Sequence, residues 1–284
     1  MRGRVCLVTG ATGGIGYETA LGLARLGARV GLVGRDADKL ARSAEQIRAA
    51  APEARIDTYR ADLSSQAEIR RLAAEVRAAC PHLHVLVNNA GAIFDRRETT
   101  VDGIERTWAL DHLGYVLLTL ELLDTMAVTA GSGGKPRIVN VASAAHYRGH
   151  IDFADLGGVK SFGPMRAYSQ AKLGNVLFTY ALARRVAGRG ITVNCLHPGV
   201  VQTGFATNTG GLFGTAWSLI RPFLISPEKG ARTSLHVATA PELDGVTGRY
   251  FSHGKPKTSS SESRDEAVQE RLWRVSLDQV GRDA

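Results

Sequence analysis

The sequence has few cysteines and lacks the cysteine spacing that builds disulfide-rich or zinc-binding domains. Its 284 residues include Cys6, Cys80 and Cys195 but no Cys-x-x-Cys pair, so neither a disulfide framework nor a metal site is indicated. Cys6 and Cys195 lie in short apolar runs. We therefore expect three buried, reduced thiols and a cytoplasmic location.

Long apolar runs are also missing. We find no apolar stretch of twenty residues, and the first short apolar run begins within five residues of Met1. A membrane-spanning helix needs about 20 apolar residues, and a signal peptide needs an apolar region of its own. We therefore expect no membrane span, signal peptide or anchor. The sequence also lacks an internal repeat and a linker, which favours one domain over residues 1–284.

Acidic residues are fewer than basic ones, and the formal net charge is +8. This charge would permit nucleic-acid binding, but the arginines are dispersed along the chain without a basic block or interleaved aromatic residues. We therefore expect no nucleic-acid partner. A positive field would favour a phosphorylated cofactor.

The sequence does contain a regular alternation of short apolar runs and helical patterns. Strands are expected at residues 5–8, 29–33, 55–59, 84–87, 137–141, 192–196 and 248–251, with helices between them. Such alternation is typical of an α/β fold with a doubly wound parallel sheet and helices on both faces. Ligands of such folds bind beyond the carboxyl ends of the strands.

A glycine-rich turn joins the first expected strand to the first expected helix. Residues 9–16 read Thr-Gly-Ala-Thr-Gly-Gly-Ile-Gly. Glycines let the backbone approach a pyrophosphate closely, and the N-terminus of the following helix directs free N–H groups at the phosphates. The order strand, glycine turn, helix therefore predicts a Rossmann-type nucleotide site. The residues expected to line it are Gly10, Thr12, Gly14, Ile15 and Gly16.

Tyr168 and Lys172 are four residues apart in a segment with a helical pattern, so they share one helix face. A tyrosine has an ordinary pKa of about 10, and a lysine charge beside it would favour the phenolate. The pair could therefore act as an acid and a base. The same spacing is common on solvated helices. The glycine turn earlier in the chain is what supports a catalytic role for this pair.

Further motifs occur at fixed places relative to the expected strands. Asn-Asn-Ala-Gly at 88–91 follows the strand at 84–87, and Ser143 follows the strand at 137–141, before Tyr168 and Lys172. In combination with the spacing Gly10-x-x-x-Gly14-x-Gly16, these motifs resemble the short-chain dehydrogenase/reductase family. The resemblance runs nearly end to end and looks closest to the retinol dehydrogenase-like branch, through residues 145–156, 172–179, 196–199 and 248–251.

The resemblance implies a role for each matching residue. Ser143 would donate a hydrogen bond to the substrate carbonyl, Tyr168 would donate the proton, and Lys172 would bind the cofactor ribose and lower the pKa of Tyr168. Asp62 and Leu63 would contact the adenine, Asn89 would lie beside the adenosine ribose, and Thr203 would bind the nicotinamide carboxamide. The remaining cofactor-binding residues that it implies are Ala90, Gly91, Pro198 and Gly199.

The end of the second expected strand bears on the choice of cofactor. NAD-specific relatives place a carboxylate where Gly34 stands, and here Arg35 follows, whose guanidinium suits a 2′-phosphate. Asp36 complicates the choice because it lies about twenty residues after the glycine turn, where a ribose-binding carboxylate is expected. It could instead cap a helix starting near Asp38. We favour NADP(H) and keep NAD(H) as the alternative.

One residue departs from the family pattern at the expected active site. Relatives have Asn-His-Leu-Gly where residues 111–114 read Asp-His-Leu-Gly, so Asp111 joins Ser143, Tyr168 and Lys172 as the fourth candidate catalytic residue. An ionised aspartate cannot donate a hydrogen bond. Near Lys172 it would favour the charged lysine and change the coupled titration of the site. The alternative is that the aspartate replaces the asparagine without any effect on function.

Two segments are candidates for the substrate side of the site. Residues 203–225 are rich in glycine and large apolar residues and follow the strand at 192–196, so we expect an apolar lid, with a surface helix or a membrane-surface helix as alternatives. The 25-residue separation of Ser143 and Tyr168 leaves an insert containing Phe153, Leu156 and Phe162, which could line a pocket or pack on the surface. His146 and His197 are interpreted as structural.

These patterns predict an NADPH-dependent carbonyl reductase, reversible as an alcohol dehydrogenase. Its substrate is expected to be a small molecule, a bulky apolar ketone or aldehyde. Retinoid, steroid and polycyclic ketones all fit this description. An NAD-linked dehydrogenase and a nucleotide-binding regulator with weakened catalysis are the alternatives. The tail at 255–284 is expected to be polar before a last helix with Leu272 and Trp273. Whether the protein forms a homo-oligomer stays open.

Overall fold

The computed structural model of the chain describes residues 1–199 and 225–283. Within these residues one sheet of eight strands runs through the centre, in the order β3-β2-β1-β4-β5-β6-β7-β8. All neighbouring strands are parallel except β7 and β8, which are antiparallel. The strands are β1 (Val5–Thr9), β2 (Arg29–Gly34), β3 (Ile56–Arg60), β4 (Val85–Asn88), β5 (Arg137–Val141), β6 (Thr192–His197), β7 (Arg249–Ser252) and β8 (Lys255–Pro256).

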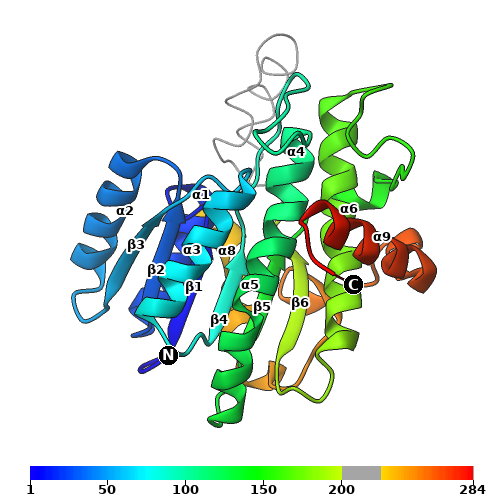
Figure 1. Cartoon of the computed structure of the whole chain (residues 1–284). Helices are drawn as coiled ribbons and strands as arrows, with labels where there is room; N and C mark the ends of the chain where they lie inside the picture. The colour runs from blue at the N-terminus through cyan, green and yellow to red at the C-terminus, as the bar shows by residue number, and fades with distance from the viewer. Residues whose placement is uncertain (200–224, 284) are drawn as a thin grey trace.

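Helices cover both faces of this sheet (Figure 1). They are α1 (Gly14–Arg25), α2 (Ala37–Ala50), α3 (Gln66–Ala79), α4 (Arg106–Trp108), the π-helical turn η1 (Ala109–Leu113), α5 (Gly114–Gly131), α6 (Pro164–Arg185), α8 (Pro227–Thr239) and α9 (Glu266–Gln279). Three short 3₁₀ segments also lie within the described residues: η2 (Ala144–Arg148), η5 (Pro241–Leu243) and η6 (Glu262–Arg264).

Two apolar clusters lie on opposite faces of the sheet. One contains side chains of α3, α5, α6 and α9, such as Leu72, Leu118 and Leu177. The other contains side chains of α1, α2 and α8, such as Leu23 and Ile47. Burial on both faces requires apolar strands, and this is the reason that the strands read as continuous apolar runs. The predicted α/β fold with a doubly wound, mostly parallel sheet is confirmed.

The seven expected strands are confirmed to within about one residue at each end. β8 was not expected, because it has only two residues and one of them is Pro256. Local chemistry sets several helix starts: Asp36 caps α2 by accepting from the Lys39 amide, and Ser226 caps α8 directly before Pro227. The last helix carries Leu272 and Trp273 as expected, while the expected lid at 203–225 lies outside the described residues except for Ile225.

One helical stretch bears on the expectation of no membrane span. Within the described residues, Arg106–Gly131 is long and apolar enough to cross a membrane by length and composition, with a mean hydropathy of 1.4. However, 61% of its most apolar window is buried inside the protein. Leu117, Leu122 and Met126 belong to the apolar cluster shared with α3 and α6. Its apolar character is therefore accounted for by packing in the core.

Candidate active site

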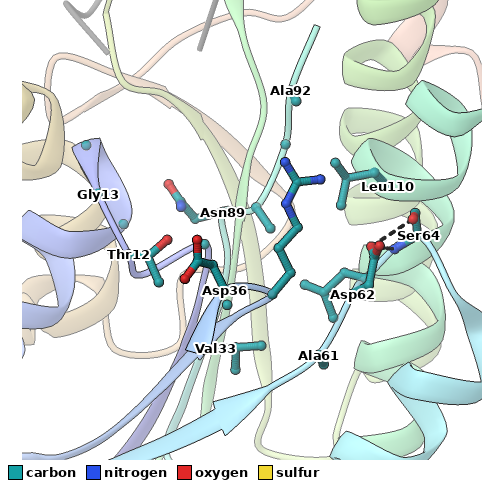
Figure 2. A pocket seen from close by; sticks show the side chains of 18 of the residues that line it. Thr12, Gly13, Val33, Asp36, Ala61, Asp62, Ser64, Asn89, Ala92 and Leu110 are labelled. Atoms are coloured by element: carbon teal, nitrogen blue, oxygen red, sulfur yellow. Dashed lines mark hydrogen bonds between the residues drawn. The ribbon is translucent and has the colours of Figure 1, made fainter. Parts of the chain in front are cut away.

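The carboxyl ends of β1, β2, β3 and β4 surround a pocket of about 470 Å³. Thr12 and Gly13 lie on one side of it, and Ser64 and Leu110 lie on the other (Figure 2). Eleven of the predicted cofactor-binding residues line this pocket: Gly10, Thr12, Gly14, Ile15, Gly16, Arg35, Asp62, Leu63, Asn89, Ala90 and Gly91. The sequence motifs are therefore brought together, although they come from four separate segments of the chain.

The glycine turn fits a dinucleotide because its backbone is packed too closely for side chains. Gly10 has φ +65°, and a Cβ there would lie 2.9 Å from the Ala90 Cα. A Cβ on Gly16 would collide with the Gly10 carbonyl oxygen. Helix α1 begins at Gly14, so its first N–H groups face the pocket where phosphates would bind.

Asn89 and Thr9 hold this turn in place. The Asn89 Nδ2 donates to the Thr9 carbonyl oxygen at 2.8 Å, and the Thr9 hydroxyl accepts from the backbone amides of Asn89 and Ala90 at 2.8 and 3.0 Å. Asn89 thus acts on the glycine turn as well as lining the pocket. Its expected contact with the adenosine ribose stays a prediction.

The end of β2 is crowded at the position where a cofactor-selecting carboxylate would stand. A Cβ on Gly34 would lie 2.6 Å from the Thr12 Cγ2 and 3.3 Å from the Leu40 Cγ. Asp36 accepts a hydrogen bond from the Lys39 amide at 3.0 Å, which lowers the pKa of its carboxyl group. Asp36 therefore caps α2, and Arg35 and Lys39 add two cations to the pocket lining.

Asp62 is held by its own loop. Its Oδ1 accepts from the backbone amide and the hydroxyl of Ser64 at 2.9 and 2.7 Å (Figure 2). The Asp62 amide in turn donates to Glu68 at the start of α3. These hydrogen bonds fix the turn that follows β3.

The candidate catalytic residues lie beside this pocket, at the carboxyl end of β5 and along α6. Ser143 follows β5 and its Oγ accepts from the Ala145 amide at 3.1 Å. Tyr168 and Lys172 lie one turn apart on α6 and are 8% and 3% exposed. The Lys172 Nζ donates to the Val141 carbonyl oxygen at 3.3 Å and lies 5.6 Å from the centroid of the Tyr168 ring. The solvated-helix alternative is therefore wrong.

Burial and two neighbouring groups shift the pKa of Tyr168. Burial raises the pKa of Tyr168 above its ordinary value, and a hydrogen bond with Ser143 lowers it by less. The Asp111 carboxylate raises it further, since two negative charges repel. Burial and the charge of Asp111 therefore oppose the lowering of the Tyr168 pKa that is expected from Lys172, and that lowering stays a prediction.

Asp111 is buried in η1, and its two carboxylate oxygens have different neighbours. Oδ1 accepts from the Ala92 amide at 2.9 Å, and Oδ2 lies 3.3 Å from the Lys172 Nζ. Within the described residues Oδ2 accepts no hydrogen bond of good geometry, so its contact with Lys172 is ionic. Burial raises the pKa of Asp111 to about 6, although Lys172 and the Ala92 amide lower it. The expected proximity of Asp111 and Lys172 is thus present.

Comparisons with known proteins agree with this geometry. The family model described as short chain dehydrogenase matches residues 4–210. The chain belongs to the short-chain dehydrogenase family. It is 41% identical to retinol dehydrogenase 12 of Mus musculus over 98% of this chain and 87% of that protein, and 40% identical to polyprenol dehydrogenase of Mus musculus over 98% and 84%. The resemblance to retinol dehydrogenases is confirmed.

Solved structures show the same fold. An uncharacterised protein from Mycobacterium paratuberculosis superposes with a TM-score of 0.79 at 29% identity, covering 99% of this chain and 95% of that one. The Pseudomonas aeruginosa RhlG/NADP complex gives a TM-score of 0.71 at 25% identity, covering 95% and 97%. As a short-chain dehydrogenase, the protein is an NAD(P)-dependent oxidoreductase acting on alcohol or carbonyl groups.

Two histidines of this short-chain dehydrogenase brace the loop that carries Ser143. The His146 Nδ1 lies 2.6 Å from the Ser143 carbonyl oxygen, and its Nε2 accepts from the Ser260 amide at 3.2 Å. The His197 Nδ1 accepts from the Ala144 amide at 3.1 Å. Burial lowers the pKa of both rings, that of His197 to about 4. These contacts agree with the structural role expected for both histidines.

The insert before Tyr168 packs on the surface of the domain. Phe153 and Leu156 pack against the apolar cluster of α3, α5 and α6, and the Arg271 guanidinium lies 4.0 Å from the centre of the Phe153 ring. Asp155 accepts from the backbone amides of Val159 and Lys160 at 2.6 and 3.0 Å, which fixes the turn. Leu156 and Phe162 also line one hollow of the surface and Phe153 lines another, so both alternatives for the insert stay open.

Three predicted cofactor-binding residues lie at or beyond the end of a described segment, and some residues of the pocket were not predicted. Pro198 and Gly199 follow β6 at the end of the described segment, and Thr203 lies outside the described residues. Cys6, Cys80 and Cys195 are buried and free. The pocket residues that sequence reasoning missed include Lys39, Arg106 and Leu110. Helical spacing from Asp36 could have indicated Lys39, whereas no local motif marks the other two.

Proposed function

We propose that the protein is an NADPH-dependent carbonyl reductase, reversible as an alcohol dehydrogenase, for a bulky apolar ketone or aldehyde. The observation that carries the proposal is the cluster of Ser143, Tyr168 and Lys172 beside the dinucleotide pocket. When bound, the nicotinamide supplies a hydride to the carbonyl carbon. Side chains of the protein supply the proton and orient the carbonyl oxygen.

Tyr168 is suited to donate a proton. Burial raises the pKa of its phenol, so the hydroxyl keeps its proton at neutral pH and can protonate the carbonyl oxygen as the C–O bond is reduced. Ser143 hydrogen-bonds Tyr168 and is placed to orient the same oxygen. A positioned general acid contributes on the order of 10² to 10⁴ in rate.

Lys172 supports this reaction as a buried cation with fixed neighbours. It is held between the Val141 carbonyl oxygen and the Asp111 carboxylate. A cation in this position stabilises negative charge that develops on the phenol oxygen after proton transfer. It would also bind the ribose hydroxyls of the cofactor, as the family resemblance implies.

The preference for NADPH is supported by the charges around the end of β2. Arg35 and Lys39 line the pocket together with Asp36, whose Oδ1 caps α2 by accepting from the Lys39 amide. The two cations outnumber this one carboxylate. The similar Pseudomonas aeruginosa protein is described as an NADP complex. Relatives named for retinol and polyprenol support an apolar substrate.

The proposal is tested by oxidation of NADPH and NADH with a panel of carbonyls that includes retinal, an apolar polycyclic ketone and a small polar aldehyde. Tyr168→Phe should lower kcat by about a hundredfold or more and leave NADPH binding intact. Tyr180→Phe is the matched control, because Tyr180 is on the same helix and bonds to Ser259 at 2.7 Å. Wild-type activity with none of the carbonyls, or a Tyr168→Phe variant with more than about a tenth of wild-type kcat, would refute the proposed chemistry.

The cofactor preference has its own test. Arg35→Ala should weaken NADPH by about ten- to a hundredfold and NADH much less, since a charge-assisted hydrogen bond contributes about 1.5 to 3 kcal/mol. Arg42→Ala removes an exposed charge of α2 that does not line the pocket, and serves as the control. Equal losses for both cofactors in a fluorescence titration would mean that Arg35 does not read the 2′-phosphate.

A further inference from the structure

The turn that carries Asp111 is held from outside by the C-terminal helix. Asp111 and His112 belong to η1, and Trp108 directly precedes this turn. The Trp108 Nε1 donates to the Gln279 Oε1 at 2.8 Å, and the His112 Nε2 lies 2.9 Å from the Ser276 Oγ. Ser276 and Gln279 both belong to α9, more than 160 residues later in the chain.

The hydrogen-bond partners assign the direction of each bond. The Asn175 Nδ2 donates to the Asp111 carbonyl oxygen at 2.8 Å, so its Oδ1 is free to accept from the His112 Nδ1 at 3.3 Å. The His112 Nε2 must then accept from the Ser276 hydroxyl. Burial lowers the pKa of His112 to about 4, which keeps the ring neutral, as this arrangement requires.

These contacts connect α9 with the backbone on both sides of the Asp111 carboxylate. Asn175 is one turn after Lys172 on α6, so the same helix that carries the lysine also holds the Asp111 backbone. The Trp108 ring packs against His112, tilted by 37°, at 4.3 Å between ring centroids. Trp108, His112 and Ser276 are at most 2% exposed, so the bond between His112 and Ser276 lies in the interior, where a hydrogen bond is stronger than at the surface.

We propose that Ser276 and Gln279 are positioning residues for the active site: through His112 and Trp108 they hold η1 so that the Asp111 carboxylate stays against Lys172. Single π-helical turns inside α-helices are rare and occur frequently at functional sites, and this one is bonded to side chains of another helix. The C-terminal helix would then be part of the support of the catalytic cluster. This inference rests on the proposed reductase function.

The inference predicts the titration of Asp111. Its carboxylate faces Lys172 and Tyr168 on α6, Tyr115 on α5 and the charge of Glu105 before α4. Among these only Lys172 lowers the pKa of Asp111. If α9 loosens, the carboxylate moves away from Lys172, and the pKa of Asp111 rises.

The decisive experiment combines Ser276→Ala with Asp111→Asn. The Asp111 carboxyl signal is followed by ¹³C NMR titration in protein labelled at aspartate and is assigned by its loss in Asp111→Asn. Ser276→Ala should raise the pKa of Asp111 and lower kcat by about three- to tenfold, the effect of one hydrogen bond of ordinary strength. In the Asp111→Asn background the same substitution should change kcat by less than about twofold.

Three comparisons separate positioning from general loss of stability. Arg274→Ala changes an exposed residue of the same helix and should leave kcat and the titration unchanged. Ser276→Thr keeps the hydroxyl and should restore both, while NADPH affinity should stay within about twofold in every variant. If Ser276→Ala does not fold, Gln279→Leu, at a partly exposed position, should give the same rise in pKa through Trp108.

An unchanged Asp111 titration in a folded Ser276→Ala or Gln279→Leu variant would overturn the inference. An equal loss of kcat with and without the Asp111 carboxylate would also overturn it, because α9 would then act by another route. If the wild type reduces no carbonyl, the proposed function fails, but the NMR titration still decides whether α9 positions Asp111.

Discussion

Asp111→Asn should change how the stability of the protein depends on pH. The carboxyl group has an ordinary pKa of 3.8, and burial raises it to about 6 in the folded protein. Between these two values the native state holds a proton that the unfolded chain has released. Stability therefore falls as pH rises through this window. An asparagine has no such proton, so the variant should lack this fall.

The magnitude follows from the size of the shift. A difference of about two pKa units corresponds to on the order of 3 kcal/mol. The attraction of Lys172 is already contained in this value, because Lys172 is one of the groups that lower the pKa of Asp111. Relative to wild type, the free energy of unfolding of Asp111→Asn should thus increase by that amount between about pH 4 and about pH 7.

Urea unfolding followed by tryptophan fluorescence measures this difference, since the buried Trp108 lies one turn from Asp111. Asp124→Asn is the control for a general loss of negative charge, because the Asp124 side chain is 98% exposed. A difference between wild type and Asp111→Asn that stays constant from about pH 4 to about pH 7 would refute the reasoning. The aspartate at position 111 would then have no effect of its own, which is the alternative given for this position in the sequence analysis.

Two further substitutions test the dinucleotide pocket. Asp36→Ala should lower the free energy of unfolding through loss of the α2 cap and leave the ratio of NADPH to NADH affinity unchanged; a ratio shifted toward NADPH would show that Asp36 binds ribose. Gly16→Ala should cost about 1 to 3 kcal/mol of stability and weaken both dinucleotides in a fluorescence titration, because its Cβ collides with the Gly10 carbonyl. Gly13→Ala, whose Cβ would meet no atom within 4 Å, is the stability control, and equal effects of both alanines would contradict the steric account.

Most of the fold could be predicted from the sequence because parallel strands buried on both faces are marked by continuous apolar runs. The same holds for the glycine turn, whose function depends on local backbone shape. β8 could not be predicted, because two residues ending in Pro256 carry no periodic signal. The long helical stretch through α5 shows the reverse problem, since burial in a core and burial in a membrane select the same residues.

The sequence indicates which residues form the candidate site, but it does not indicate which groups shift their pKa values. The sequence places Tyr168 and Lys172 on one face, yet the pKa of Tyr168 depends on burial and on Asp111, which is far away in the chain. The contact of Ser276 with His112 spans 164 residues and belongs to no motif. Such long-range pairs are set by how helices pack on the sheet, which spacing along the sequence does not contain.

The crowding at Gly34 restricts how a protein of this kind could change its coenzyme. A carboxylate at this position would bring a Cβ to within 2.6 Å of the Thr12 methyl group, so Gly34→Asp is expected to be harmful when it occurs first. Thr12→Ser removes that methyl group while keeping the hydroxyl, and it opens the space beforehand. The order of the two changes therefore matters, and a lineage or a laboratory selection that exchanges NADPH for NADH should acquire the serine before the aspartate.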